Sequence, residues 1–205
     1  MQPPQAIVHK FGGTSVGSAE RFCAVADILS QHHGVERLSA AGAGDGASLR
    51  KPSRAVVVVS AMSGVTNALL SGAWAAAEGR EAAYHQVKNE LLARHLAVVA
   101  ALFAPGPARD ALTALIGDRL SRLERLYDSI AVLGELTARG RDHVAAFGET
   151  LSVEILAACL RVRGLASEAV LASDLIVTDD HFGAATPLMD RTGRKLQERL
   201  VPLLD

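Results

Sequence analysis

Several kinds of residue are scarce in this chain of 205 residues, and each scarcity excludes a class of function. Phe, Trp and Tyr make up only 4% of the sequence, which offers no aromatic platform for stacking nucleic-acid bases. The 21 basic and 22 acidic side chains nearly cancel, so there is no charge excess of the kind that attracts nucleic acid or an anionic membrane. The sequence therefore predicts no nucleic acid and no membrane as partner.

Long apolar runs, a leader and metal-site spacings are missing too. No window has the ~20 uninterrupted apolar residues of a membrane span, and the first residues lack the charged and apolar regions of a signal peptide. The only cysteines, Cys23 and Cys159, lie among apolar neighbours on predicted helix faces, which favours buried free thiols over a disulfide. The seven histidines have no spacing typical of zinc sites. We expect a soluble, cytoplasmic protein without metal ligands of its own.

The most informative stretch present is a glycine turn directly after the short apolar run Ala6-Ile7-Val8. It combines a cation, two glycines and two hydroxyls in the run Lys10-Phe11-Gly12-Gly13-Thr14-Ser15. A strand, a glycine turn and a following helix aim backbone N–H groups at an anion, and glycines let a phosphate come close. Lys10 would neutralise charge on a transferring phosphoryl group. The stretch predicts the phosphate site of a small-molecule kinase, although a plain turn beside a solvated lysine fits the local pattern too.

The turn is not one of the two common nucleotide-binding motifs. It is not G-x-G-x-x-G, and the Walker A pattern G-x-x-x-x-G-K-[ST] occurs nowhere in the chain. A second glycine-rich stretch, between residues 34 and 54, has no periodicity and predicts a long surface loop. A phosphate cradle there is the weaker hypothesis, because no strand precedes its glycines.

A second strand is predicted by the β-branched run from residue 55 to 59, a pattern typical of a parallel sheet covered on both faces. An amphipathic helix over 18–33 separates the two strands and makes a right-handed βαβ unit. The loop 60–67 then leaves the sheet at the same carboxyl edge as the glycine turn, where ligands bind in open α/β folds. Ser60 and Thr66 are therefore candidate substrate ligands, although Thr66 could merely cap the next helix.

The middle of the chain, residues 81–137, predicts two helices separated at Pro105-Gly106-Pro107. The second helix has an apolar face at spacings of three and four, made of Leu112, Ile116, Leu120, Leu123, Leu126, Ile130 and Leu133. We expect an antiparallel helical pair inserted into the sheet domain, which either covers the active site or meets another subunit. Short apolar runs at 168–171 and 175–177 predict a further strand and an edge element, and 190–204 a last helix.

Glu149 follows Phe147-Gly148 at the start of another predicted helix, which closes at Gly164. From position alone, its carboxylate could simply complement the helix dipole, as acidic residues in a first turn often do. The alternative, a role in binding substrate, cannot be chosen from this pattern by itself.

Four segments in order resemble aspartate kinases of the amino-acid-kinase superfamily. They are Lys10 to Val16, Val58 to Asn67, Phe147-Gly148-Glu149 and, more weakly, Thr178 to Gly183. The resemblance implies an α/β fold of the amino-acid-kinase, carbamate-kinase-like type: a three-layer αβα arrangement around an open, mainly parallel sheet. The helical pair at 80–137 would be its insertion.

The resemblance also implies an activity. Aspartate kinases transfer the γ-phosphoryl group of ATP to the β-carboxylate of L-aspartate, with Mg²⁺ bound through the nucleotide, giving 4-phospho-L-aspartate for lysine, threonine and methionine biosynthesis. By this resemblance Lys10 is catalytic, the run from Lys10 to Ser15 binds ATP phosphates, and Glu149 holds the α-ammonium of aspartate. Ser60 and Thr66 would orient the acceptor.

Two departures from the family pattern bear on this expectation. Several aspartate kinases place an arginine for the α-carboxylate directly after this Phe-Gly, whereas here Phe182-Gly183 is followed by Ala184. Arg139 or Arg141 could substitute, the carboxylate could be bound differently, or affinity could be low.

The second departure concerns length. The family's nucleotide-binding half and its regulatory ACT domains would follow residue 205. We therefore expect 1–205 to be the amino-acid-binding part of a kinase domain, inactive alone, from an enzyme that is a homo-oligomer when complete. The alternatives are a kinase of the same superfamily for another small carboxylate or carbamate, and a non-catalytic half-domain that binds a ligand or subunit.

Overall fold

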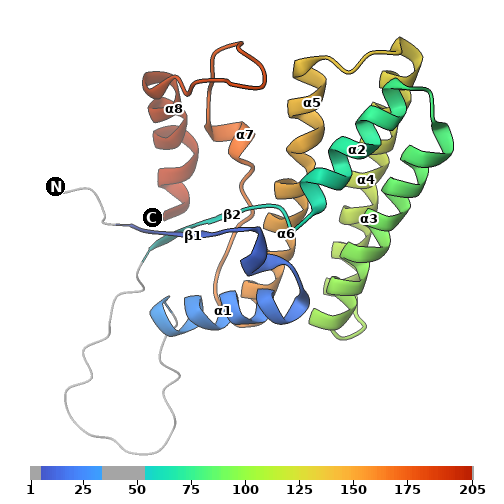
Figure 1. Cartoon of the computed structure of the whole chain (residues 1–205). Helices are drawn as coiled ribbons and strands as arrows, with labels where there is room; N and C mark the ends of the chain where they lie inside the picture. Colours follow the sequence, from blue (N-terminus) through green and yellow to red (C-terminus); the bar gives the residue numbers. More distant parts are fainter. Residues whose placement is uncertain (1–5, 34–53, 205) are drawn as a thin grey trace, which may run out of the picture.

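The computed structural model describes residues 6–33 and 54–204, so the expected glycine-rich loop between residues 34 and 54 lies outside the described residues, apart from Arg54. Figure 1 shows two strands with α1 along one side, a group of long helices beyond their ends, and a small C-terminal part. The elements are β1 (Ile7–Phe11), a 3₁₀ turn (Gly13–Val16), α1 (Ala19–His33), β2 (Ala55–Val59), α2 (Val65–Ala77), α3 (Glu81–Leu102), α4 (Pro107–Leu133), α5 (Ala138–Ala145), α6 (Phe147–Val162), α7 (Ala172–Leu175), α8 (Met189–Lys195), a π turn (Leu196–Leu200) and a last 3₁₀ turn (Val201–Leu204).

The two strands pair in parallel, as predicted for a βαβ unit. Ile7 lies opposite Ala55 and Phe11 opposite Val59, so both strands end at the same level of the sheet. The helix between them begins where expected, since Ser18 accepts a hydrogen bond from the backbone N–H of Arg21. The chain after Phe11 and the chain after Val59 therefore emerge side by side.

The sheet seen in the described residues is smaller than the predicted three-layer arrangement. It has two strands, and most of the described chain is helical. The strand predicted at 168–171 is wrong, because these residues have no regular structure, and the edge element at 175–177 is wrong as well. A single antiparallel bridge, Thr178 to Pro187, is found nearby. A short apolar run becomes a strand only beside a partner strand, and within 6–33 and 54–204 no strand pairs with either run.

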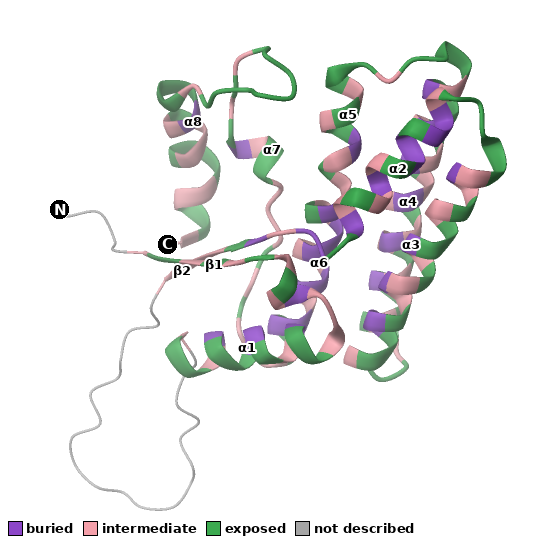
Figure 2. Cartoon of the chain, in the orientation of Figure 1, coloured by how far each residue is buried: buried purple, intermediate pink, exposed green. Residues whose placement is uncertain are grey.

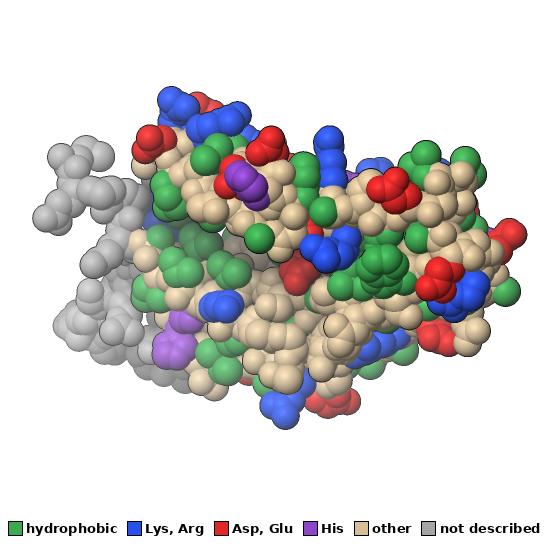
Figure 3. Space-filling model, turned by 45° about the horizontal axis from the view of Figure 1, so that its top comes forward, with side chains coloured by type: hydrophobic (Ala, Val, Ile, Leu, Met, Phe, Trp, Pro, Cys, Tyr) green, Lys and Arg blue, Asp and Glu red, His purple; other side chains and the backbone are tan. Residues whose placement is uncertain are grey.

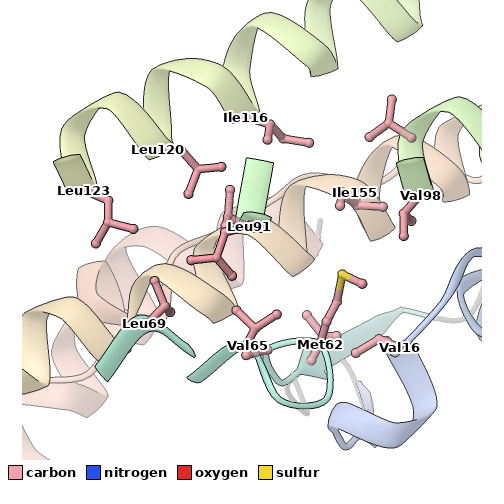
Figure 4. Close-up of a cluster of buried hydrophobic side chains, with 14 of the residues drawn as sticks. Val16, Met62, Val65, Leu69, Leu91, Val98, Ile116, Leu120, Leu123 and Ile155 are labelled. Carbon is pink, nitrogen blue, oxygen red and sulfur yellow. The ribbon is translucent and has the colours of Figure 1, made fainter. Parts of the chain in front are cut away.

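The core lies among the helices and against one end of the strands. Figure 2 shows buried residues on the facing sides of α2, α3, α4 and α6. In Figure 4, side chains from the 3₁₀ turn, the chain after β2 and these four helices point toward one another, among them Val16, Met62, Leu69, Leu91, Leu120 and Ile155. The predicted helical pair is thus confirmed as two helices, and it forms part of the same hydrophobic core as the strands.

The predicted apolar face of α4 is mostly buried, with a change at its end. Leu112, Ile116, Leu120, Leu123 and Ile130 are buried, whereas Leu133 is 73% exposed. Tyr127, which the spacing did not include, is fully buried, and its hydroxyl donates to the backbone oxygen of Leu69 at 2.7 Å. This hydrogen bond links α4 to α2.

One helical stretch, 138–162, is long and apolar enough to cross a membrane by length and composition. Half of its apolar window is buried inside the molecule, and α6 packs against α1, α2 and α4. Buried core helices pass the same test, so the stretch is weak evidence for a span.

Candidate functional site

A cleft of about 370 Å³ opens where β1 and β2 end and where α2 and α6 begin. Backbone groups and small polar side chains make up most of its lining, which consists of Gly13, Ser60, Ala61, Met62, Ser63, Gly64, Thr66, Asn67 and Glu149. Figure 3 shows the surface hollowed near the middle of one face, with basic and acidic side chains beside the hollow. A polar cleft at the carboxyl end of parallel strands is the usual position for a ligand in α/β folds.

The two chain segments that leave the strands are joined by backbone hydrogen bonds. The N–H of Ser60 donates to the oxygen of Phe11 at 3.1 Å, and the N–H of Ser63 donates to the oxygen of Gly13 at 3.2 Å. A Cβ on Gly13 would lie 2.7 Å from the backbone oxygen of Ala61, too close to be accommodated. Gly13 is therefore explained by the contact between the two segments.

The neighbouring Gly12 has different surroundings. A Cβ built on it would meet nothing within 4 Å, and its backbone is extended, with φ of −77°. Only Gly12 of the predicted pair therefore leaves open space beside the backbone, where an anion could approach. From the sequence alone, both glycines are expected to let a phosphate come close.

Glu149 reaches the cleft because α6 packs unusually close to the segment after β2. Its Oε1 accepts a hydrogen bond from the backbone N–H of Ala61 at 3.2 Å. A Cβ on Gly148 would lie 2.5 Å from the Cβ of Ala61 and 3.3 Å from Cγ1 of Val65. The glycine of the Phe-Gly-Glu run thus sets the distance at which its neighbour's carboxylate meets the cleft.

The far side of the cleft is held by α3. Nη2 of Arg94 donates to the backbone oxygen of Ser63 at 2.8 Å. Gly64 follows with φ of +80°, a left-handed conformation that favours glycine, and α2 starts at Val65. Sequence reasoning missed Arg94, because a single arginine on a long helix looks like any other solvated charge.

The structure brings together four of the predicted site residues, Gly13, Ser60, Thr66 and Glu149. Asn67 and Ser63 lie there as well. Neither was chosen as a site residue, although both belong to the Val58 to Asn67 run whose resemblance could have pointed to them.

The remaining predicted residues do not line the cleft, and they are Lys10, Phe11, Gly12, Thr14 and Ser15. Lys10 is exposed, in register with Val58, and no described residue forms an ion pair with it. Alternation along a strand puts it on the face opposite Phe11, which packs against the core. The part of the site expected to bind phosphate therefore lies beside the cleft, toward the strands.

The two arginines considered as substitutes for the residue at Ala184 lie together at the same loop. The Cζ atom of Arg139 sits 5.6 Å from the ring centroid of Phe182, in a cation–π arrangement. The guanidinium of Arg141 lies against Gly183, too close to leave room for a Cβ at that position. The N–H of Gly183 donates to Oδ2 of Asp142 at 2.5 Å. Neither arginine lines the cleft.

The same loop is closed by its own hydrogen bonds. Oδ1 of Asp179 accepts from the backbone N–H of Thr186 at 3.1 Å and from that of His181 at 3.2 Å. The hydrogen bond from Thr186, followed by those from His181, holds the pKa of Asp179 below its usual range. The carboxylate of Asp179 therefore stabilises the conformation of this loop.

Metal binding by the chain has no support in the residues that the structure describes. Among 6–33 and 54–204, no group of three His, Cys, Asp or Glu side chains is placed to hold an ion. Glu149 is the one carboxylate in the lining of the cleft.

Comparison with known proteins identifies the family. A model described as the amino acid kinase family matches residues 5–204. The chain belongs to the amino acid kinase family. Its relatives include chloroplastic aspartokinase 3 of Arabidopsis thaliana, 33% identical over 177 residues, which cover 85% of this chain and 27% of the relative. The aspartokinase of Chlamydia pneumoniae is 29% identical over 184 residues, which cover 90% of this chain and 34% of the relative.

Solved structures agree on the fold of this amino acid kinase family member. Escherichia coli aspartokinase III, in complex with lysine and aspartate, superposes with a TM-score of 0.74 at 22% identity, over 97% of this chain and 38% of that one. The same enzyme with aspartate and ADP gives a TM-score of 0.74 at 23% identity. The resemblance to aspartate kinases is confirmed, and the chain spans only about a quarter to a third of the length of the relatives named above.

Proposed function

We propose that this chain forms the aspartate-binding part of an ATP-dependent aspartate kinase, which produces 4-phospho-L-aspartate. The observation that carries the proposal is the carboxylate of Glu149, which stands in a polar cleft at the ends of two parallel strands and is fixed by the N–H of Ala61. The relatives named above are aspartokinases, and the enzyme from E. coli with the same fold binds aspartate and ADP.

The cleft offers complementary groups for an amino acid. Glu149 would pair with the α-ammonium through the oxygen that Ala61 does not occupy. Ser60 and Thr66, with Asn67 beside them, would hydrogen-bond the acceptor and orient its β-carboxylate. That carboxylate is already ionised at neutral pH, so the reaction needs no general base. The work of these residues is then to position the attacking oxygen.

The phosphoryl side of the reaction would lie at the glycine turn. Lys10, exposed near the end of β1, would stabilise charge on the transferring group, and the N–H groups of Gly12 and Gly13 would bind its oxygens. Mg²⁺ would neutralise phosphate charge, and it would come with the nucleotide, since the described residues offer it no cage of carboxylates.

Binding of L-aspartate to the chain, measured by titration calorimetry, tests the acceptor site. Glu149→Gln should weaken binding by about 10- to 150-fold, because it removes a charge-assisted contact of about 1.5–3 kcal/mol. Glu90→Gln is the matched control, since Glu90 is exposed on α3 and only accepts a bond from Gln86. Absence of saturable binding, or equal effects of the two variants, would refute the proposed site.

A second candidate is a chain that binds aspartate without turnover. The observation favouring it is that most residues predicted to bind phosphate, Lys10, Gly12, Thr14 and Ser15 among them, do not line the cleft. A coupled assay of ADP release with Mg-ATP distinguishes the two functions. Release that requires aspartate supports the kinase, binding without release supports the non-catalytic reading, and release with another small carboxylate or carbamate would identify a different acceptor.

A further inference from the structure

The two cysteines of this chain, far apart in sequence, meet at the contact between α1 and α6. Nη1 of Arg163 donates to Sγ of Cys159 at 2.9 Å, and Nε donates to Oδ1 of Asp27 at 3.1 Å. The thiol of Cys23, one helical turn from Asp27, lies near enough to raise the pKa of Arg163. One guanidinium therefore contacts Cys159 and Asp27 and interacts with Cys23.

Helix geometry explains why the four side chains converge. Cys23 and Asp27 are one turn apart on α1. Cys159 lies in the last turn of α6, and Arg163 caps the C-terminus of that helix one turn later, so each pair lies on one side of its helix. The two helices pack against each other, and α6 passes close to α1 in Figure 1. The sulfur atoms are consequently brought to the same place in the interface.

The two thiols differ in access to solvent. Cys23 is partly exposed, whereas Cys159 is 2% exposed. Burial is the main cause that raises the pKa of Cys159, and the nearby Arg163 only partly offsets it. A dissolved oxidant can thus reach Cys23, while Cys159 stays a protected thiol behind it.

We propose that Cys23 and Cys159 form an oxidation site that closes to a disulfide linking α1 to α6, with hydrogen peroxide as the oxidant. The sulfur of Cys23 attacks one peroxide oxygen; the O–O bond breaks, the second oxygen leaves as water, and Cys23 becomes a sulfenic acid. The sulfur of Cys159 then attacks that of Cys23, the S–O bond breaks, and the hydroxyl leaves as a second water with the thiol proton. Two thiols give two electrons to one peroxide.

The arrangement suits this chemistry better than it suits two inert core residues. A buried thiol used only for packing needs apolar neighbours, whereas these sulfurs share a cation that is itself tied to Asp27. The guanidinium of Arg163 holds the side chain of Cys159 at the contact between α1 and α6, where Cys23 also lies. The sequence had predicted two free thiols, and they are free in this structure, so the disulfide is a second state of the same pair.

The test treats the full chain with a small excess of hydrogen peroxide and analyses it by mass spectrometry without reduction. We expect the intact mass to fall by two hydrogen atoms, a cross-linked peptide containing both cysteines, and reversal by dithiothreitol. Cys159→Ser should stop at a sulfenic acid on Cys23 that dimedone traps. Cys23→Ser should give no dimedone adduct under the same conditions.

Arg163→Met tests the shared guanidinium, and its cross-linking should be several-fold slower than that of the wild-type chain. Peroxide that leaves both thiols reduced, oxidises Cys23 beyond sulfenic acid without a cross-link, or joins two chains through Cys23 would overturn the proposal. None of these readouts depends on kinase activity or on aspartate binding, so the two proposals can fail separately.

Discussion

At the scale of single residues, the shape of the cleft depends on two glycines, at positions where no Cβ would fit. Gly13 lets the segment after β1 touch the segment after β2, and Gly148 lets α6 touch Ala61. Each contact is too short for a Cβ, and each brings backbone or carboxylate groups to the cleft. The two glycines position the polar groups of the cleft because they let neighbouring segments pack closely.

Gly148→Ala should therefore destabilise the chain. The new methyl group would overlap the Cβ of Ala61, and relieving the overlap costs about 1–3 kcal/mol in a packed core. Gly117→Ala is the matched control on α4, where a Cβ meets nothing within 4 Å, and it should stabilise the helix by about 0.5–1 kcal/mol. Urea unfolding of both variants gives the two free energies, and a stable Gly148→Ala protein would show that α6 can shift.

A buried histidine makes stability depend on pH. His95 is fully buried, its Nδ1 hydrogen-bonds the oxygen of Leu91 at 2.6 Å, and its buried Nε2 has no partner among the described residues. Burial lowers the pKa of His95 below its usual value. The unfolded chain takes up this proton near pH 6.5, whereas the folded chain takes it up only at a lower pH, so stability should fall as pH drops below about 6.5.

His95→Leu removes this proton uptake and should flatten the pH dependence. The measurement is the free energy of unfolding of both proteins at about pH 7.5 and about pH 5.5, values on either side of the unfolded pKa. The wild-type chain should lose more stability than the variant between the two, and the difference belongs to His95. Equal losses would mean that its ring is protonated inside the fold.

At the scale of elements, α3 contributes directly to the structure of the cleft. It carries Arg94, which donates to the oxygen of Ser63 and so fixes the segment between β2 and α2 from the side opposite α6. The predicted helical pair therefore stabilises one segment of the cleft, and this is how helices outside the sheet can influence binding.

Arg94→Met should weaken aspartate binding by about 2- to 10-fold, corresponding to one hydrogen bond of about 0.5–1.5 kcal/mol that orders the loop. The thermal midpoint should change little, because the side chain is only partly buried and its hydrogen bond lies at the surface. Arg125→Met, an exposed arginine of α4 facing away from the buried stripe, is the control and should leave binding unchanged. Titration calorimetry and thermal unfolding check both variants, and unchanged binding in Arg94→Met would separate α3 from the site.

Sequence patterns predicted elements well where one periodicity runs for several turns. The 3–4 spacing of α4 and the break at Pro105-Gly106-Pro107 gave both long helices, and the two β-branched runs gave the parallel pair. They failed at 168–171 and 175–177, because three or four apolar residues do not say whether a neighbouring strand exists.

Part of the candidate site was predictable as a list of residues, whereas its contacts were not. Ser60 and Thr66 could be chosen because they follow a strand at one edge of the sheet, and Glu149 was chosen through the resemblance to aspartate kinases. The distinction between Gly12 and Gly13, and the contribution of Arg94, depend on which segments touch in space. Spacing along the chain does not contain that information.

At the scale of the whole molecule, the elements that form the cleft belong to the same hydrophobic core that stabilises the fold. The core joins the strands, α1 and the helices from α2 to α6, and its last buried member is Leu160. The part with α7 and α8 is mostly exposed in Figure 2 and meets the rest through the loop at Phe182 and Gly183. The helical insertion should therefore unfold together with the cleft.

Tyr127→Phe tests this cooperativity, because it changes α4 while the only tryptophan, Trp74, reports from α2. Loss of the hydrogen bond to Leu69 should cost about 1 kcal/mol. Tyr84→Phe is the matched control and should cost less, since the partner it leaves, Asp128, is exposed and can be hydrated. For both variants the urea transitions followed by tryptophan fluorescence and by far-ultraviolet circular dichroism should coincide. If instead Tyr127→Phe shifts only the dichroism transition, the helical pair folds separately, and the cleft cannot owe its geometry to α3.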